Sequence, residues 1–172
     1  RFNKGNSSDN PAAGELPLFS HMYVKSLEAE QLYDSLIIAT NAHKSGRSSW
    51  DAAEKKRQEW MRQFVIVFDT DENDESTTFD GTIPQALMMM NGDLVKNAIS
   101  IKNGSYLQKL LSEKTSDAGK VQKLFLTTLG RKPSRVELSA SNKLIRGNRN
   151  KIAAFQNLFW ALLNSNEFIF NH

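Results

Sequence analysis

Three histidines, His21, His43 and His172, are the residues of this sequence best suited to acid–base or metal chemistry. None of them has a ligand-type neighbour at the spacing of a known metal motif. The chain also has no nucleophile elbow, no P-loop and no Gly-x-Gly-x-x-Gly pattern. The sequence therefore predicts no catalytic residue and no cofactor, which favours a non-catalytic role and leaves enzymatic activity open.

An acidic segment, residues 69–75, is the second candidate for chemistry. Asp69, Asp71 and Asn73 repeat the alternating oxygen ligands of calcium loops. The glycine and the bidentate glutamate of an EF-hand are replaced by Asp74 and Asp80. The favoured interpretation is a hydrated loop, and the alternative is a weak calcium site.

A basic segment between residues 131 and 151 is the third candidate. It holds one acid, Glu137, and seven bases: Arg131, Lys132, Arg135, Lys143, Arg146, Arg149 and Lys151. A phosphate-binding or nucleic-acid face is one interpretation. No aromatic residue lies among the bases, so we favour a solvated surface or pairing with the acidic first half of the chain. That half, residues 1–80, has 9 Lys/Arg and 14 Asp/Glu, whereas residues 81–172 have 13 and 5. No nucleic-acid partner is predicted.

Composition limits the class of protein further. The chain has 172 residues, 40% of them hydrophobic and 24% charged, which is ordinary for one globular domain. The absence of cysteine excludes disulfides, thiolate metal sites and a cysteine nucleophile. No apolar stretch approaches the length of a membrane span.

Predicted helices hold these candidate residues in place, and capping residues mark where the helices begin. Residues that can cap a helix precede apolar stripes of helical period at six positions. These are Ser26, Ser48, Thr82, Asp93, Ser116 and Ser134. They predict helices over 27–43, 48–68, 83–91, 93–101, 116–129, 134 onward and 151–169, with a further helix after Ser105. Residues 64–68 could instead form a strand, because their types favour β structure.

Two predicted features concern particular residues. Pro84 and Gln85 suit the first turn of a helix that ends at Asn91 and Gly92, a pair suited to a left-handed cap. The last helix carries so wide an apolar arc that we expect it to be the central packing element. Its Trp160 is predicted to be buried, and Asn164 and Asn171 to bond adjoining loops.

The expected fold is all-α, an irregular bundle of about seven or eight short helices. Residues 1–15 read as a linker or tail and residues 16–172 as a single helical domain. Because the chain opens with Arg1, we expect it to be a fragment of a longer protein.

Several blocks together resemble the C-terminal region of the planctomycete-type family of large exported proteins of unknown function. The blocks are 23–25 with 29–36, Arg62 with Phe64 and Phe68, 83–87 with 90–92, 129–133 with Glu137 and Leu138, and 160–168 with 170–172. The resemblance covers about residues 19–172. It implies an exported or cell-envelope location and a multidomain parent, often with a cytochrome-c-like module. It implies no catalytic residues.

The function expected from these observations is a non-catalytic helical module that packs against, or docks for, the rest of a large exported protein. Its partners would be upstream domains of the same polypeptide. The alternative is part of a hydrolase acting on extracellular carbohydrate, with a site completed by upstream residues. Its local support is three scattered acids, Glu30, Asp34 and Glu167.

Overall fold

The structure is a computed structural model that describes residues 25–68 and 83–171. The elements in chain order are β1 (Lys25–Ser26), α1 (Ala29–Thr40), the 3-10 turn η2 (Ala42–Lys44), α2 (Trp50–Phe68), α3 (Ile83–Asn91), α4 (Asp93–Ala98), α5 (Tyr106–Ser112), α6 (Asp117–Leu129), α7 (Arg135–Gly147), α8 (Lys151–Leu163), α9 (Asn166–Ile169) and β2 (Phe170–Asn171). The predicted all-α class is confirmed. The predicted linker 1–15 and the acidic segment 69–75 lie outside the described residues.

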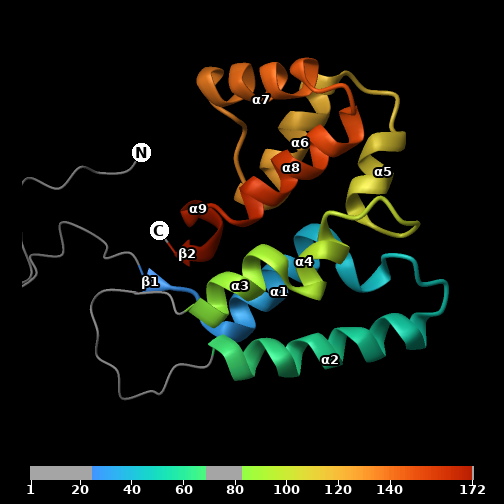
Figure 1. Cartoon of the computed structure of the whole chain (residues 1–172), viewed down its shortest axis with the longest axis vertical. Coiled ribbons are helices and arrows are strands. Elements are labelled where there is room, and N and C mark those ends of the chain that lie inside the picture. The colour runs from blue at the N-terminus through green and yellow to red at the C-terminus, as the bar shows by residue number, and fades with distance from the viewer. Residues whose placement is uncertain (1–24, 69–82, 172) are drawn as a thin grey trace, which may run out of the picture.

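The two ends of the described chain meet in a short antiparallel pair. Lys25 of β1 lies opposite Asn171 of β2, and Ser26 lies opposite Phe170. Figure 1 shows α2 along one edge of the molecule and α7 along the opposite edge, with α1, α3, α4, α6 and α8 between them. The described residues form no sheet beyond these two strands.

Helix α2 settles the choice between helix and strand for residues 64–68 in favour of helix. The rings of Phe64 and Phe68 stack at 4.2 Å, and Phe64 also contacts Tyr33 of α1. The apolar stripe of α2 therefore extends through residues 64–68, and Phe64 packs against α1. Trp50, the first residue of α2, does not belong to the core, because its side chain is 75% exposed.

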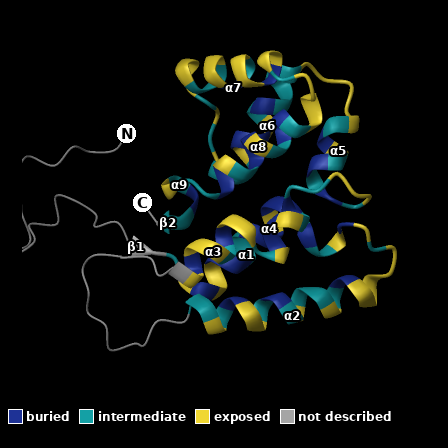
Figure 2. Cartoon of the chain, viewed as in Figure 1, coloured by how far each residue is buried: buried dark blue, intermediate teal, exposed yellow. Residues whose placement is uncertain are grey.

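Helix α8 is the central packing element, as predicted. Six of its residues are buried: Ala154, Phe155, Leu158, Phe159, Leu162 and Leu163. They pack against α6, α7 and α9, and the Gln156 side-chain amide donates to the Ile99 carbonyl at 2.9 Å. Figure 2 shows the buried residues on the inward sides of the helices, whereas the outward sides of α2 and α7 are largely exposed.

The predicted helix 151–169 is interrupted at residues 164–165, where α8 ends and α9 begins. The Asn164 amide donates to the Trp160 carbonyl at 2.9 Å, and the Ser165 hydroxyl donates to the Leu162 carbonyl at 2.7 Å. These side chains satisfy carbonyls of the last turn of α8, as short polar residues do where helices end. At the other end of α8, Ile152 is exposed and does not belong to the core.

The predicted helix caps are confirmed where the capping side chain bonds a backbone amide three residues further along the chain. Ser105, Ser116 and Ser134 accept the expected backbone hydrogen bonds, and Gly130 ends α6 in the left-handed conformation with φ 65°. Helix α1 begins two residues later than a Ser26 cap predicts, with Glu28 as its N-cap. The predicted cap at Asp93 is wrong too.

Candidate functional site

Helix α7 begins in a turn that its own sequence stabilises. The Ser134 hydroxyl accepts from the Glu137 amide at 3.3 Å, and a Glu137 carboxylate oxygen accepts from the Ser134 amide at 2.7 Å. This is the predicted capping box, and it satisfies two amides that would otherwise lack partners. It also turns the Glu137 carboxylate back toward the end of α6.

A three-residue group, the Arg131 cluster (Arg131, Glu137 and Glu167), fixes this turn to the end of the chain. Arg131 donates to both Glu137 oxygens at 2.7 and 2.9 Å and to both Glu167 oxygens at 2.5 and 2.6 Å. Its guanidinium carbon also lies 5.8 Å from the centre of the Phe125 ring. Two bidentate pairs on one guanidinium constrain the angle between α7 and α9.

The electrostatics of the cluster follow from these contacts. Hydrogen bonds from Arg131 are the largest effect on Glu137, and with the Ser134 capping bonds they outweigh partial burial and lower the pKa of Glu137 to about 2. The same bonds raise the pKa of Arg131 further above its usual range. Both groups are therefore charged at neutral pH.

The inner side of α7 determines which residues face outward. Ser141 and Ile145 are buried and Leu138 is partly buried, and the helix packs on α6 and α8. The opposite side is the α7 outer face, defined as Arg135, Val136, Ser139, Ala140, Lys143, Leu144 and Arg146. Each of its members is exposed.

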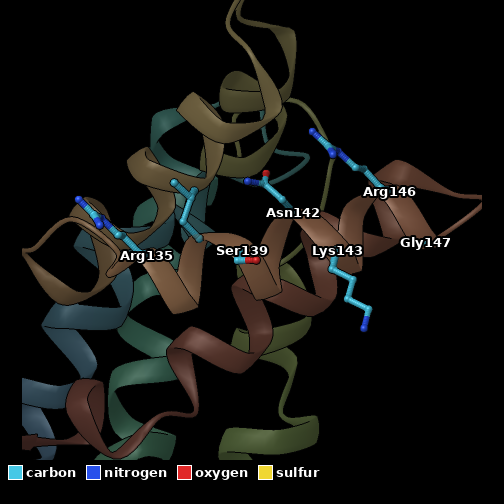
Figure 3. A pocket seen from close by; sticks show the side chains of 7 residues that line it. Arg135, Ser139, Asn142, Lys143, Arg146 and Gly147 are labelled. Carbon is cyan, nitrogen blue, oxygen red and sulfur yellow. The ribbon is translucent and has the colours of Figure 1, made fainter.

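Part of this face is hollow. The hollow is lined by Arg135, Leu138, Ser139, Asn142, Lys143, Arg146 and Gly147. Figure 3 shows the side chains of Arg135, Asn142 and Arg146 directed to the same side of the helix, whereas Lys143 points away from them. The hollow therefore presents two guanidinium groups and an amide on one side of the helix.

The structure sorts the seven bases of the predicted basic segment into two groups. Arg131 is held by the cluster, and Lys151 pairs with Asp117 at 2.8 Å. The other five are exposed and form no ion pair within residues 25–68 and 83–171: Lys132, Arg135, Lys143, Arg146 and Arg149. A solvated surface is thus confirmed for these five. The predicted ion pairs between these seven bases and acids of residues 1–80 do not occur among the described residues, where Arg131 and Lys151 pair with acids of the second half instead.

The predicted structural residues of α3 have separate roles. Pro84 lies in the first turn, as predicted, and the buried Gln85 donates to the Val67 carbonyl at 3.2 Å, which ties α3 to the end of α2. Asn91, the last residue of α3, is exposed. The left-handed cap is wrong, because Gly92 has φ −60°.

Gly92 is required for a different reason. A Cβ at this position would overlap the Met88 carbonyl oxygen, which accepts a hydrogen bond from the Gly92 amide at 2.8 Å. Glycine thus permits the close approach of residue 92 to the last turn of α3.

Trp160 lies on α8, and Asn164 is the C-cap residue that follows this helix. The Trp160 indole N–H donates to the Met90 carbonyl at 3.1 Å, but the ring is only partly buried. Asn164 bonds within its own helix rather than to an adjoining loop. The side chain of Asn171 lies outside the described residues.

A second polar group, around Trp60, escaped the sequence analysis. The buried Trp60 indole donates to Asp93 at 3.0 Å, and Lys56 lies 3.3 Å from the same Asp93 oxygen. Partial burial would raise the pKa of Asp93, but the bonds from Trp60 and Lys56 outweigh it and lower that pKa. Asp93 was predicted as a helix cap, and only its contact with α2, more than 30 residues away, reveals this role.

The candidates for catalysis and metal binding remain separate. His21 and His172 lie outside the described residues, as do Asp69, Asp71 and Asn73. His43 is half-buried, and burial is the largest effect that lowers its pKa. No group of three metal-ligating side chains occurs in the described part of the chain.

The three acids of the hydrolase alternative do not form a catalytic pair in the described structure. Glu30 is exposed on α1, Asp34 lies 3.5 Å from Arg57, and both oxygens of Glu167 bind Arg131. A carboxylate held by a guanidinium has a structural partner already and is poorly placed to act as an acid or nucleophile.

Comparison of the chain with protein-family models, with curated proteins and with solved structures found no match. Within the described residues, no helix is both long and apolar enough to cross a membrane. The resemblance to the planctomycete-type family therefore stays a prediction.

Proposed function

We propose that this chain is a non-catalytic docking module of a large exported protein, and that it docks through the α7 outer face. The partner would be another part of the same polypeptide, as the family resemblance implies. Exported or cell-envelope location enters this proposal through that resemblance alone.

One observation carries the proposal: α7 presents basic and apolar side chains to solvent on the same face. Val136 is 78% exposed and Leu144 is 40% exposed. Next to them lie three exposed bases that form no ion pair with any other described residue: Arg135, Lys143 and Arg146. Exposed apolar residues bordered by unpaired charge are typical of surfaces that bind another macromolecule.

The rest of the structure supports a fixed orientation for this face. The capping box, the Arg131 cluster and the buried Ile145 attach α7 to α6, α8 and α9. A docking surface on a rigid helix loses little conformational freedom when it binds. The hydrolase alternative receives no comparable support, because Glu167 and Asp34 already have basic partners.

Lysine-directed cross-linking of the longest natural polypeptide that contains this sequence tests the proposal. Lys143 and Lys132 should cross-link to residues outside the 172-residue chain. Lys55, an exposed lysine on α2, is the matched control and should show no such links or far fewer.

Two results would contradict the proposal. One is a full set of cross-links in which Lys143 and Lys132 reach only residues within the chain. The other is an equal yield of external links from Lys55, which would mean that the α7 outer face is not distinguished from the remaining surface.

A further inference from the structure

The arginines of the α7 outer face are spaced like positions along a helix–helix contact. Arg135 and Arg146 are eleven residues apart, with Ser139 and Asn142 between them at offsets of four and seven. Eleven residues of α-helix span about 16 Å and three turns, so all four residues share one side. The hollow lined by these residues follows that side of the helix.

The centre of the face allows close approach. Ser139 is small and exposed, and around the helix it lies between the two arginines and the larger Val136, whereas the small, exposed Ala140 lies between Val136 and Leu144. Small side chains between larger ones form a groove that accepts the ridge of a second helix at an interaxial distance of about 8–10 Å.

The charge of the face specifies the partner. Glu137 is the only acid on α7, and both of its oxygens are held by Arg131. A bound carboxylate would therefore meet Arg135 and Arg146 without competition from this helix. The offset of eleven residues would place two acids of a partner helix, also three turns apart, opposite the two arginines.

We infer that the α7 outer face binds an acidic amphipathic α-helix that lies along α7. Carboxylates about three turns apart on this helix pair with Arg135 and Arg146, and its apolar residues cover Val136. This inference rests on the proposed function, because the helix would belong to the docked part of the protein.

Two other classes of ligand fit the face less well. Binding to an anionic membrane surface relies on large apolar and aromatic residues, but Val136 and Leu144 are the only large apolar residues of the outer face. Proteins that bind single-stranded nucleic acid stack its bases on aromatic side chains, and α7 contains no aromatic residue.

The experiment titrates the 172-residue chain against two synthetic helical peptides and follows fluorescence anisotropy in about 50 mM salt, where charge screening is modest. Both peptides have the same composition of alanine, leucine, glutamate and glutamine. In the first, two glutamates are eleven residues apart on one side of the helix. In the second, they are six residues apart and lie on different sides.

The first peptide should bind about two- to fivefold more tightly than the second, because only it can engage both arginines together. Replacement of both, Arg135→Gln with Arg146→Gln, should remove that difference. The matched control, Lys109→Gln with Lys114→Gln, removes two exposed charges elsewhere and should leave it unchanged.

Equal binding of the two peptides, or a preference that survives the arginine replacements, would overturn the inference. So would tighter arginine-dependent binding to vesicles of anionic phospholipid or to a DNA duplex. If the cross-links from Lys143 are found but the peptides do not differ, the proposed function stands and the acidic helix is excluded. If the cross-links are absent, the proposed function fails whatever the peptides do.

Discussion

Replacement of the central arginine, Arg131→Met, should measurably destabilise the fold. Methionine keeps much of the side-chain volume but removes the four hydrogen bonds that hold Glu137 and Glu167. The two carboxylates then face each other without a cation, and α9 loses its attachment to the α6–α7 turn. The loss combines a missing attraction with a new repulsion.

The magnitude follows from the pKa of Glu137. A fall from the ordinary value, about 4.5, to about 2 corresponds to an upper limit of ~3 kcal/mol. The Glu137 side chain is 34% exposed and Arg131 is 38% exposed, so solvent screening reduces this figure. We expect Arg131→Met to lower the free energy of unfolding at pH 7 by about 2 kcal/mol.

Urea denaturation at several pH values, followed by far-UV circular dichroism, measures this effect. Because the folded pKa of Glu137 is depressed, its stabilisation is fully present above about pH 4.5 and is lost as the pH falls toward 2. The difference between Arg131→Met and the parent should therefore shrink over that interval. Lys151→Met is the control, because it breaks an exposed pair with Asp117 and should cost at most about 0.5 kcal/mol.

Two outcomes would refute this reasoning. If Arg131→Met lowers the free energy of unfolding no more than Lys151→Met at pH 7, the Arg131 cluster contributes no more to stability than an exposed ion pair. If the cost is large but unchanged between pH 7 and pH 2, the arginine acts through packing on Phe125 and not through its carboxylate partners.

Three further predictions concern single side chains. The free energy of unfolding should fall as the pH drops below about 6.5, because burial lowers the pKa of His43 in the folded chain and the unfolded chain is therefore protonated first. The His43→Gln variant should show a flatter dependence of the urea midpoint on pH in this range. Gly92→Ala should lower the thermal midpoint strongly through overlap with a backbone oxygen, whereas Gly147→Ala, where the Cβ meets open space, should leave it unchanged or raise it. Phe159→Ala should cost about 3–5 kcal/mol in urea denaturation, and Trp160→Ala clearly less, because Phe159 is 0% exposed and Trp160 is only partly buried; equal costs would contradict the assigned burial.

Much of the fold could be predicted because its signals act over three or four residues. The capping box at Ser134, the cap at Ser116 and the left-handed Gly130 are each satisfied by immediate neighbours. Their presence in the sequence was enough to place α6 and α7. The apolar arc of α8 likewise predicted a central helix, because an arc that wide must be covered on several sides.

Other expectations were wrong where the outcome depends on distant residues. Asp93 was expected to cap α4, but its carboxylate accepts from the Trp60 indole of α2, 33 residues away. Trp160 was expected to be buried, but it is only partly buried, and its indole N–H donates to the Met90 carbonyl, 70 residues away. Neither the neighbouring helix nor its distance can be read from local periodicity.

For the candidate site, the sequence by itself determined the chemistry, and the tertiary structure determined which groups are available. Seven bases and one acid between residues 131 and 151 are evident from the amino-acid order. Glu167, 36 residues from Arg131, occupies that arginine, while Arg135 and Arg146 remain on the outer face. The physical reason is that a charge is neutralised by whichever opposite charge the folded backbone brings within hydrogen-bonding distance, and chain folding sets that distance independently of separation in sequence.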